Sequence, residues 1–184
     1  MFVVDNFIPY TLQEQIKHTL LVEDFPWFYV NDITSLDGSQ QRPAFSHLIY
    51  DDFKKVSNLN IDYLAHFGAY QVDFPLNGIK RAKTLLQLPL ASNFSGHELD
   101  HLHVDMPEAH LVVLYYVIDA DGDTIICDHA FDGTERKNLQ AEDFKVIEKV
   151  TPKQGRAVIF DGRYYHTAEQ PKNGMRCIIN LNVV

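Results

Sequence analysis

The chain has 184 residues, of which 46% are hydrophobic and 22% charged, and its net charge is −9. This length and composition are typical of one globular domain and exclude a disordered or membrane class, because no apolar run approaches the roughly 20 residues that span a bilayer. The acidic charge argues against nucleic acid as the main partner, since phosphate binding draws much of its affinity from Lys and Arg.

The amino-terminal segment lacks the basic region and the long apolar region of a signal peptide. The two cysteines, Cys127 and Cys177, each lie in a strand-like stretch and are too few for a disulfide framework. These features predict a cytoplasmic protein in which both cysteines are small buried hydrophobic residues. Nothing in the sequence indicates the oligomeric state.

Residues 1–77 are predicted to form a helical N-terminal part. Thr11 and Glu14 match a capping box, with Thr11 as the N-cap of the first helix. The apolar residues on one face of that helix are Leu12, Ile16 and Leu20. A second, weaker helix is predicted from Ile61 to Tyr70. Both helices are expected to pack on one face of a sheet.

From Gly78 onward, short β-prone runs alternate with turn sequences rich in Gly, Asp, Asn and Pro. The predicted strands are Thr84–Leu88, Leu102–Asp105, His110–Ile118, Thr124–Asp128, Val146–Val150, Ala157–Phe160, Tyr164–Thr167 and Met175–Val183. Short strands without long helices between them favour a sandwich or jelly roll. We therefore predict a single domain over residues 1–184, mostly β, with a jelly-roll core over residues 78–184.

The stretch that carries the strongest chemical signal is His101-Leu-His103-Val-Asp105. Because alternate side chains of a strand share a face, His103 and Asp105 would point the same way and Val104 the opposite way. An imidazole beside a carboxylate, with one distant histidine, makes a facial triad that binds iron(II) and leaves coordination positions open. The motif alone is weak, because one His-x-Asp match is expected about once by chance in such a sequence.

Two further residues strengthen the motif. His166 follows a predicted buried strand and tight turn that begin at Gly155 and pass through Phe160. Arg176 follows at the start of the last predicted strand, where one face holds Arg176, Ile178, Asn180 and Asn182. An inward-facing guanidinium needs an anionic partner, because burying an unpaired charge is costly. A carboxylate ligand held by two parallel hydrogen bonds would supply that partner.

In order and spacing, these residues resemble the 2-oxoglutarate- and iron(II)-dependent oxygenases, specifically the prolyl-4-hydroxylase-like branch of small bacterial and phage type. That family's pattern is His-x-Asp, a long spacer, Gly-x-x-x-x-Phe, a turn, a histidine, and a basic residue about ten positions later. The resemblance covers about residues 78–184 and implies a cupin-like double-stranded β-helix. It also implies that His103, Asp105 and His166 hold the metal and that Arg176 holds 2-oxoglutarate.

The same resemblance implies a dioxygenase reaction. It would use Fe(II), O2 and 2-oxoglutarate, with ascorbate as an optional cofactor, to hydroxylate an unidentified substrate and release succinate and CO2. The prime substrate is expected to be a peptide, a protein or a small molecule. Peptidyl proline is the first candidate, on the analogy with the family alone. DNA-repair demethylases have a further Arg where this chain has Asn182, which counts against that branch.

Tyr116 falls where the second Tyr of a Tyr-Tyr pair contacts the distal carboxylate of the cosubstrate in that family. Those relatives carry another Tyr on the strand before the His-x-Asp motif. This chain has no Tyr there, because Gln87 and Leu88 occupy that neighbourhood. The competing interpretations are a buried core aromatic for Tyr116 and a surface ion pair with Glu169 for Arg176.

Two other classes of protein fit the same residues. One is a cupin-like metal-dependent enzyme that does not use 2-oxoglutarate, which would have no need of Arg176 opposite the metal. The other is a non-catalytic binding module on the same fold, against which the intact triad argues. Among the remaining residues, His97 and His101 are expected in loops or behind the metal ligands, although His101 could replace a member of the triad. Trp27 is expected in the core.

Overall fold

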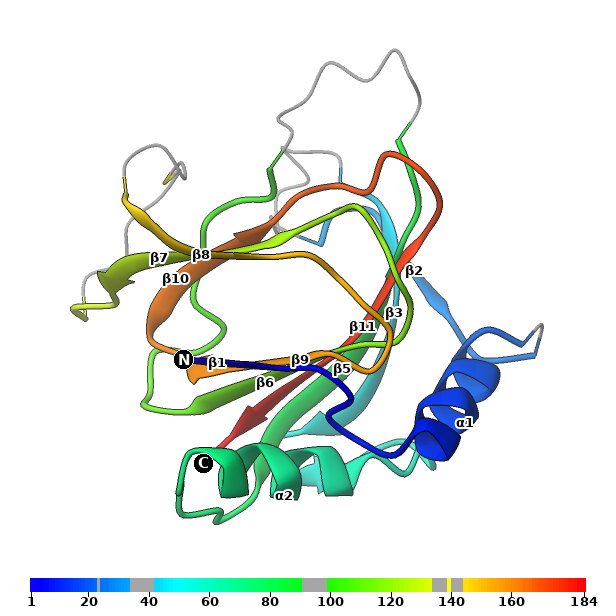
Figure 1. Cartoon of the computed structure of the whole chain (residues 1–184), viewed down its shortest axis with the longest axis horizontal. Helices are drawn as coiled ribbons and strands as arrows, with labels where there is room; N and C mark the ends of the chain where they lie inside the picture. Colours follow the sequence, from blue (N-terminus) through cyan, green and yellow to red (C-terminus); the bar gives the residue numbers. More distant parts are fainter. Residues whose placement is uncertain (23, 34–41, 91–98, 134–138, 140–143) are drawn as a thin grey trace.

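The computed structural model describes residues 1–22, 24–33, 42–90, 99–133, 139 and 144–184, and its strands form two sheets arranged as a jelly roll (Figure 1). The helices are α1 (Tyr10–Leu20) and α2 (Asp62–Gln71). The strands are β1 (Phe2–Val4), β2 (Phe28–Val30), β3 (Ala44–Asp51), β4 (Lys54–Lys55), β5 (Ile79–Gln87), β6 (Leu111–Tyr116), β7 (Thr124–Ala130), β8 (Val146–Val150), β9 (Ala157–Asp161), β10 (Tyr164–Ala168) and β11 (Arg176–Val183).

The larger sheet has the strand order β1-β9-β6-β11-β5-β3-β2, with β4 paired to β3, and the smaller sheet has the order β10-β7-β8. The pairings in both sheets are antiparallel. The predicted mostly β fold of the double-stranded β-helix type is therefore confirmed.

Seven of the eight strands predicted after residue 78 form, six of them with shifted ends and Val146–Val150 with the predicted ones. The exception is Leu102–Asp105, where the prediction of a continuous strand was wrong. An isolated bridge joins His103 to His166 instead, and another joins Leu99 to Glu169. This segment runs antiparallel beside β10 and then bends at Asp105, shortly before Pro107, which has no backbone N–H to donate to a ladder.

The helical description of residues 1–77 was incomplete, because this part also contains strands β1 to β4. The largest of them, β3, pairs along β5 in the larger sheet, and β1 pairs with β9. A register shift between Leu48 and Tyr50 interrupts β3. Such a bulge breaks the period-two alternation by which a strand is recognised in a sequence.

The predicted capping box was wrong. Helix α1 begins at Tyr10 with Pro9 as its N-cap, no side chain caps it, and Thr11 is exposed in its first turn. The Pro9 carbonyl accepts hydrogen bonds from the backbone N–H groups of Leu12 and Gln13. The predicted apolar face is otherwise as expected: Ile16 and Leu20 are buried and Leu12 is partly buried.

The main hydrophobic core lies between the two helices and one face of the larger sheet. Ile16 and Leu20 of α1 and Leu64 of α2 pack in it with strand residues, so the predicted helical cover on one sheet is confirmed. Trp27 packs against this core as predicted, and its Nε1–H donates to the Leu20 carbonyl at 3.0 Å. A second cluster, which includes Tyr116 and Phe160, fills the space between the two sheets.

Both cysteines are buried and free, which agrees with their predicted role as small hydrophobic residues. Within the part of the chain that the structure describes, neither helix has the length and apolar character needed to cross a membrane.

Candidate metal and cosubstrate site

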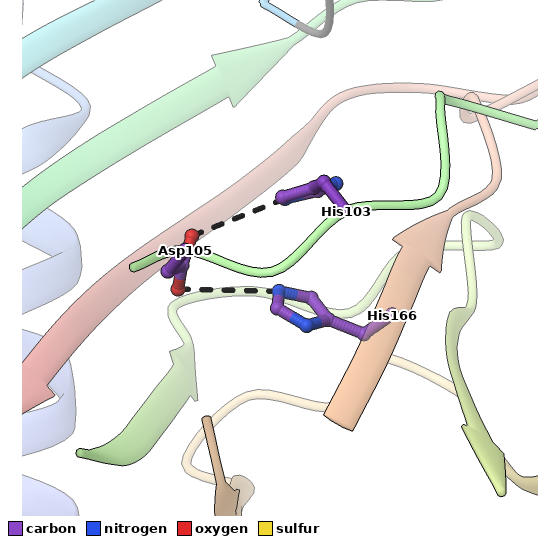
Figure 2. A group of neighbouring side chains, drawn as sticks. All are labelled: His103, Asp105 and His166. Carbon is purple, nitrogen blue, oxygen red and sulfur yellow. Dashed lines mark ion pairs between the residues drawn. The ribbon is translucent and has the colours of Figure 1, made fainter. Parts of the chain in front are cut away.

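His103, Asp105 and His166 converge between the two sheets (Figure 2). Their candidate ligand atoms all lie within 4.8 Å of one another. Nε2 of His103 lies 3.9 Å from Oδ1 of Asp105, and Nε2 of His166 lies 3.9 Å from Oδ2. Because bonds from a divalent metal to nitrogen and oxygen are about 2 Å long, neighbouring ligands of one ion lie about 3 Å apart, so these three side chains would close by about 1–2 Å around a bound ion. The donor set, two imidazoles and one carboxylate, is that of a facial triad.

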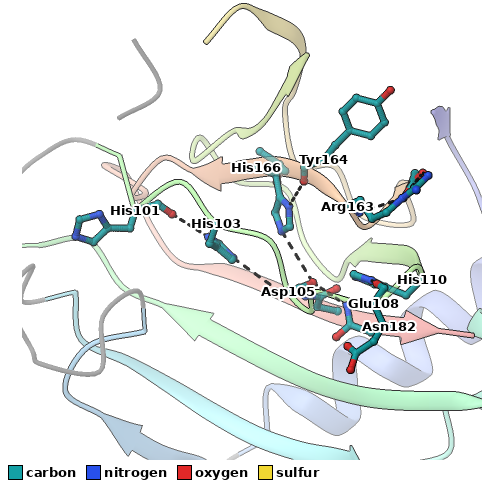
Figure 3. Close-up of polar contacts among 12 residues, drawn as sticks. His101, His103, Asp105, Glu108, His110, Arg163, Tyr164, His166 and Asn182 are labelled. Carbon is teal, nitrogen blue, oxygen red and sulfur yellow. Dashed lines mark hydrogen bonds and ion pairs between the residues drawn. The ribbon is translucent and has the colours of Figure 1, made fainter. Parts of the chain in front are cut away.

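The backbone fixes both imidazole rings. Nδ1–H of His103 donates to the His101 carbonyl at 2.8 Å, and Nδ1–H of His166 donates to the Tyr164 carbonyl at 3.1 Å (Figure 3). The bridge between the two histidine backbones, with N–O distances of 3.0 and 2.9 Å, holds the segments together. A hydrogen-bonded Nδ1–H selects the tautomer whose Nε2 lone pair is free for a metal.

Two amides hold the carboxylate. Nδ2 of Asn180 and Nδ2 of Asn182 donate to the same oxygen, Oδ2 of Asp105, at 2.9 and 2.7 Å, and Figure 3 shows Asn182 beneath the carboxylate. Oδ1 then faces His103. The sequence places both asparagines on the Arg176 face of the last strand, but it contains no signal that they would hold Asp105.

The charge states suit a divalent cation. Burial lowers the pKa of His103 to about 4, and the nearby His166 lowers it as well, so the ring is neutral at pH 7. Burial by itself would raise the pKa of Asp105, but His166, His103 and Lys83, together with the hydrogen bond from the Asn180 amide, lower it, so the carboxyl group is ionised. Metal ligands must be deprotonated, and the His103 ring and the Asp105 carboxyl group are both in their metal-binding form at pH 7.

We expect Asn182→Leu to weaken Co(II) binding by about 10- to 100-fold, which is typical when a group behind a metal ligand is lost. The reason is that Asp105 would lose one of the two donors that orient it. Calorimetric titration measures the affinity. Asn173→Leu is the matched control, because the Asn173 amide donates to exposed Asp121 instead. Equal affinity of the Asn182→Leu variant and the wild type would show that the amide has no orienting role.

Arg176 lies on β11 and is only 2% exposed. Its Nε donates to the Gly122 carbonyl at 2.9 Å, Nη1 donates to Oε1 of Gln87 at 2.8 Å, and Nη2 donates to Oγ1 of Thr124 at 2.9 Å. All three partners are uncharged. The alternative ion pair with Glu169 does not form, because that carboxylate pairs with Lys149 at 2.7 Å.

Gly122 allows the close approach of Arg176 to the backbone. A Cβ at this position would lie 2.6 Å from the Glu169 carbonyl oxygen and 3.1 Å from Cδ of Arg176. A side chain there would displace the carbonyl that accepts from the guanidinium. The turn around Gly122 was recognised in the sequence only as a strand boundary.

One cavity joins the triad to Arg176. Its walls include His103, Asp105 and His166, together with Arg176, Gln87, Thr124, Asn180 and Lys83. The larger sheet also contributes apolar side chains to it, namely Leu85, Leu114 and Ile178. A metal and a ligand held by the guanidinium would therefore share one enclosure.

Tyr116 is fully buried and is not among the described residues that line this cavity. Its hydroxyl donates to Oγ1 of Thr124 at 2.8 Å, and its ring centroid lies 5.9 Å from Cζ of Arg176. Thr124 thus accepts from both residues, which leaves its own hydroxyl proton to be donated. The direct contact between Tyr116 and a cosubstrate stays a prediction.

The other histidines near the motif have lesser roles. His101 contributes its carbonyl to His103, and its ring points away from the triad (Figure 3). Among the described residues, only His103, Asp105 and His166 form a group that could hold a metal ion. The alternative in which His101 is one of the three metal ligands therefore has no support. His97 lies outside the described residues. Leu88 is exposed, whereas Gln87 is buried beside Arg176.

No family model matches this sequence, and no curated protein does. Solved structures do match. The alpha-ketoglutarate-dependent carbocyclase SnoK of nogalamycin biosynthesis has a TM-score of 0.67 at 12% identity, over 98% of this chain and 78% of SnoK. A Trichoplax adhaerens prolyl hydroxylase, solved with a hypoxia-inducible factor peptide, has a TM-score of 0.62 at 14% identity, over 99% and 82%.

A third similar structure is a Pseudomonas putida prolyl-4-hydroxylase, with a TM-score of 0.59 at 12% identity, over 99% of this chain and 91% of that one. The chain therefore has the jelly-roll fold that is shared by 2-oxoglutarate- and iron(II)-dependent oxygenases. Fold alone does not define an activity, so the function has to be argued from the site.

Proposed function

We propose that this protein is a 2-oxoglutarate- and Fe(II)-dependent dioxygenase that hydroxylates its substrate and releases succinate and CO2. The observation that carries this proposal is one cavity that contains both a His-Asp-His triad and a buried Arg176 with uncharged hydrogen-bond partners. A buried guanidinium whose hydrogen-bond partners among the described residues are all uncharged is suited to a ligand that brings its own carboxylate.

Each residue has a distinct task in this proposal. His103, Asp105 and His166 would hold Fe(II), which supplies O2 activation when bound. Arg176 binds the distal carboxylate of 2-oxoglutarate through its planar fork, and Thr124 donates its free hydroxyl proton to the same carboxylate. The apolar side chains Leu85, Leu114 and Ile178 exclude water from the reaction. O2 and an optional ascorbate complete the set of cofactors.

The prime substrate is proposed to be a peptide or a small molecule. Both kinds occur among proteins of the same fold, because the Trichoplax enzyme was solved with a peptide and the epimerase SnoN with nogalamycin RO. Arg176 argues against the cupin-like alternative without 2-oxoglutarate, and the complete triad argues against a non-catalytic binding module. The single-domain organisation and the cytoplasmic location stay predictions.

The test is turnover of the cosubstrate alone. Protein supplied with Fe(II), O2 and 2-oxoglutarate is expected to release succinate slowly without a prime substrate, through uncoupled decarboxylation. Succinate is measured by chromatography, with the His166→Ala variant as the inactive control. If metal-loaded wild-type protein neither binds 2-oxoglutarate by calorimetry nor releases succinate, the proposal is wrong and the cupin-like alternative is favoured.

A further inference from the structure

Lys83 is a cation in the cavity that the metal and cosubstrate assignments do not use. It lies on β5, where it pairs across the sheet with Asn180 of β11 and Leu48 of β3, and it lines the same cavity as the triad. Within the described part of the chain, its ammonium group forms no hydrogen bond or ion pair. Burial lowers the pKa of Lys83, and only the nearby charge of Asp105 opposes this effect appreciably.

Lys83 is the residue whose charge is left over when the charges of the cavity wall, the metal and 2-oxoglutarate are counted together. With the metal and 2-oxoglutarate bound, the two positive charges of the metal and that of Arg176 would be balanced by Asp105 and by the two carboxylates of 2-oxoglutarate. Asp100, the other acidic residue of the cavity wall, has the buried Arg42 guanidinium 3.7 Å away. Lys83 is then the one cation among the described wall residues whose charge is not balanced. A partly buried cation favours an anionic partner.

Asn180 provides an independent indication of a ligand at this place. It lies directly across the sheet from Lys83 and is 6% exposed. Its Nδ2 donates a hydrogen bond to Oδ2 of Asp105, whereas its Oδ1 is buried and has no hydrogen-bond partner among the described residues. Since a buried acceptor without a donor is costly, this oxygen is suited to an N–H or O–H group of a ligand. Lys83 and Asn180 together would recognise an anion with an adjacent donor.

We propose that Lys83 binds an anionic group of the prime substrate, a carboxylate or a phosphate, and that Oδ1 of Asn180 accepts a hydrogen bond from a donor beside it. This inference rests on the proposed function, because it concerns the substrate of the same site. The contact anchors the substrate next to the metal and makes an organic anion the preferred substrate class. Arg81, exposed on the same face of β5, extends the positive charge toward solvent.

The experiment measures whether simple anions bind beside the metal. Protein is loaded with Mn(II), which accepts the same donor types and is paramagnetic, and with 2-oxoglutarate in the absence of O2. Acetate, inorganic phosphate and neutral acetamide are titrated, and the relaxation of their NMR signals by Mn(II) reports binding near the metal. The wild type should bind an anion and exclude acetamide. Lys83→Met should weaken anion binding by at least about tenfold, since a charge-assisted contact is lost.

Two variants control the comparison. Lys83→Arg keeps the charge and should retain most of the anion binding. Lys80→Met removes a cation from the opposite face of the same strand, where its ammonium lies 3.5 Å from Asp52, and should bind anions as the wild type does. Stronger binding of acetate than of phosphate identifies the group as a carboxylate, and the reverse order identifies a phosphate.

Equal anion binding by Lys83→Met and wild type overturns the inference, as does equal binding of acetate and acetamide by wild type. The binding of 2-oxoglutarate is measured on the same samples. Its absence in the wild type would contradict the proposed oxygenase, whereas the comparison of Lys83→Met with wild type would still decide whether Lys83 binds an anion. The two failures are therefore distinguishable.

Discussion

Asp105→Asn and His166→Ala are each expected to lower the affinity for a divalent metal by more than about a hundredfold, because loss of a group behind a ligand alone typically costs 10- to 100-fold. Asp105→Asn suits this test, since the new side chain keeps an oxygen that can accept from Asn180 and Asn182. Co(II), Ni(II) or Zn(II) can replace iron(II) in the titration, because such sites bind the later metals more tightly.

The control for metal binding is His18→Ala, which removes an exposed histidine from helix α1. It should leave stoichiometry and affinity unchanged. Circular dichroism should show the same fold in all three variants, because the triad lies in the cavity wall and outside the clusters that form the hydrophobic core. Unchanged metal stoichiometry in both ligand variants would refute the assignment of the triad.

Arg176→Met is expected to keep the metal and to lose the cosubstrate. Removing one partner of a buried, hydrogen-bonded charge pair costs about 2–5 kcal/mol, because the other charge is left unpaired. This corresponds to roughly 30-fold to several-thousandfold weaker binding of 2-oxoglutarate. Arg176→Lys should be milder but still harmful, since Lys keeps the charge and loses the planar fork. Calorimetry on Zn(II)-loaded protein measures both affinities.

Pyruvate is a 2-oxo acid without a distal carboxylate, so it tests how much that carboxylate contributes to the binding of 2-oxoglutarate. It should bind wild type and Arg176→Met about equally weakly. Arg163→Met, which removes an exposed guanidinium paired with Asp161, is the matched control and should bind 2-oxoglutarate as wild type does. If Arg176→Met binds 2-oxoglutarate as tightly as wild type, Arg176 is a structural residue.

The local signals in the sequence were sufficient to bring His103 and Asp105 together as candidate metal ligands. His103 and Asp105 are two residues apart on an extended segment. Because the alternation of side chains depends only on the local backbone, both side chains point the same way although no continuous strand forms. The strands after residue 78 were likewise recognisable from apolar runs between turn sequences. The first helix was predicted for the same reason, although its cap was not.

Only the tertiary structure decided which side chains meet across strands. The pairing of Asn180 with Lys83, the convergence of Asn180 and Asn182 on Asp105, and the placement of Thr124 between Tyr116 and Arg176 depend on strand register between distant segments. A shift of one residue would turn each side chain to the opposite face. The sequence by itself therefore determined the types and order of the residues proposed to bind a metal, whereas the register of the larger sheet determined how these candidate ligands are oriented and which charges face the cavity.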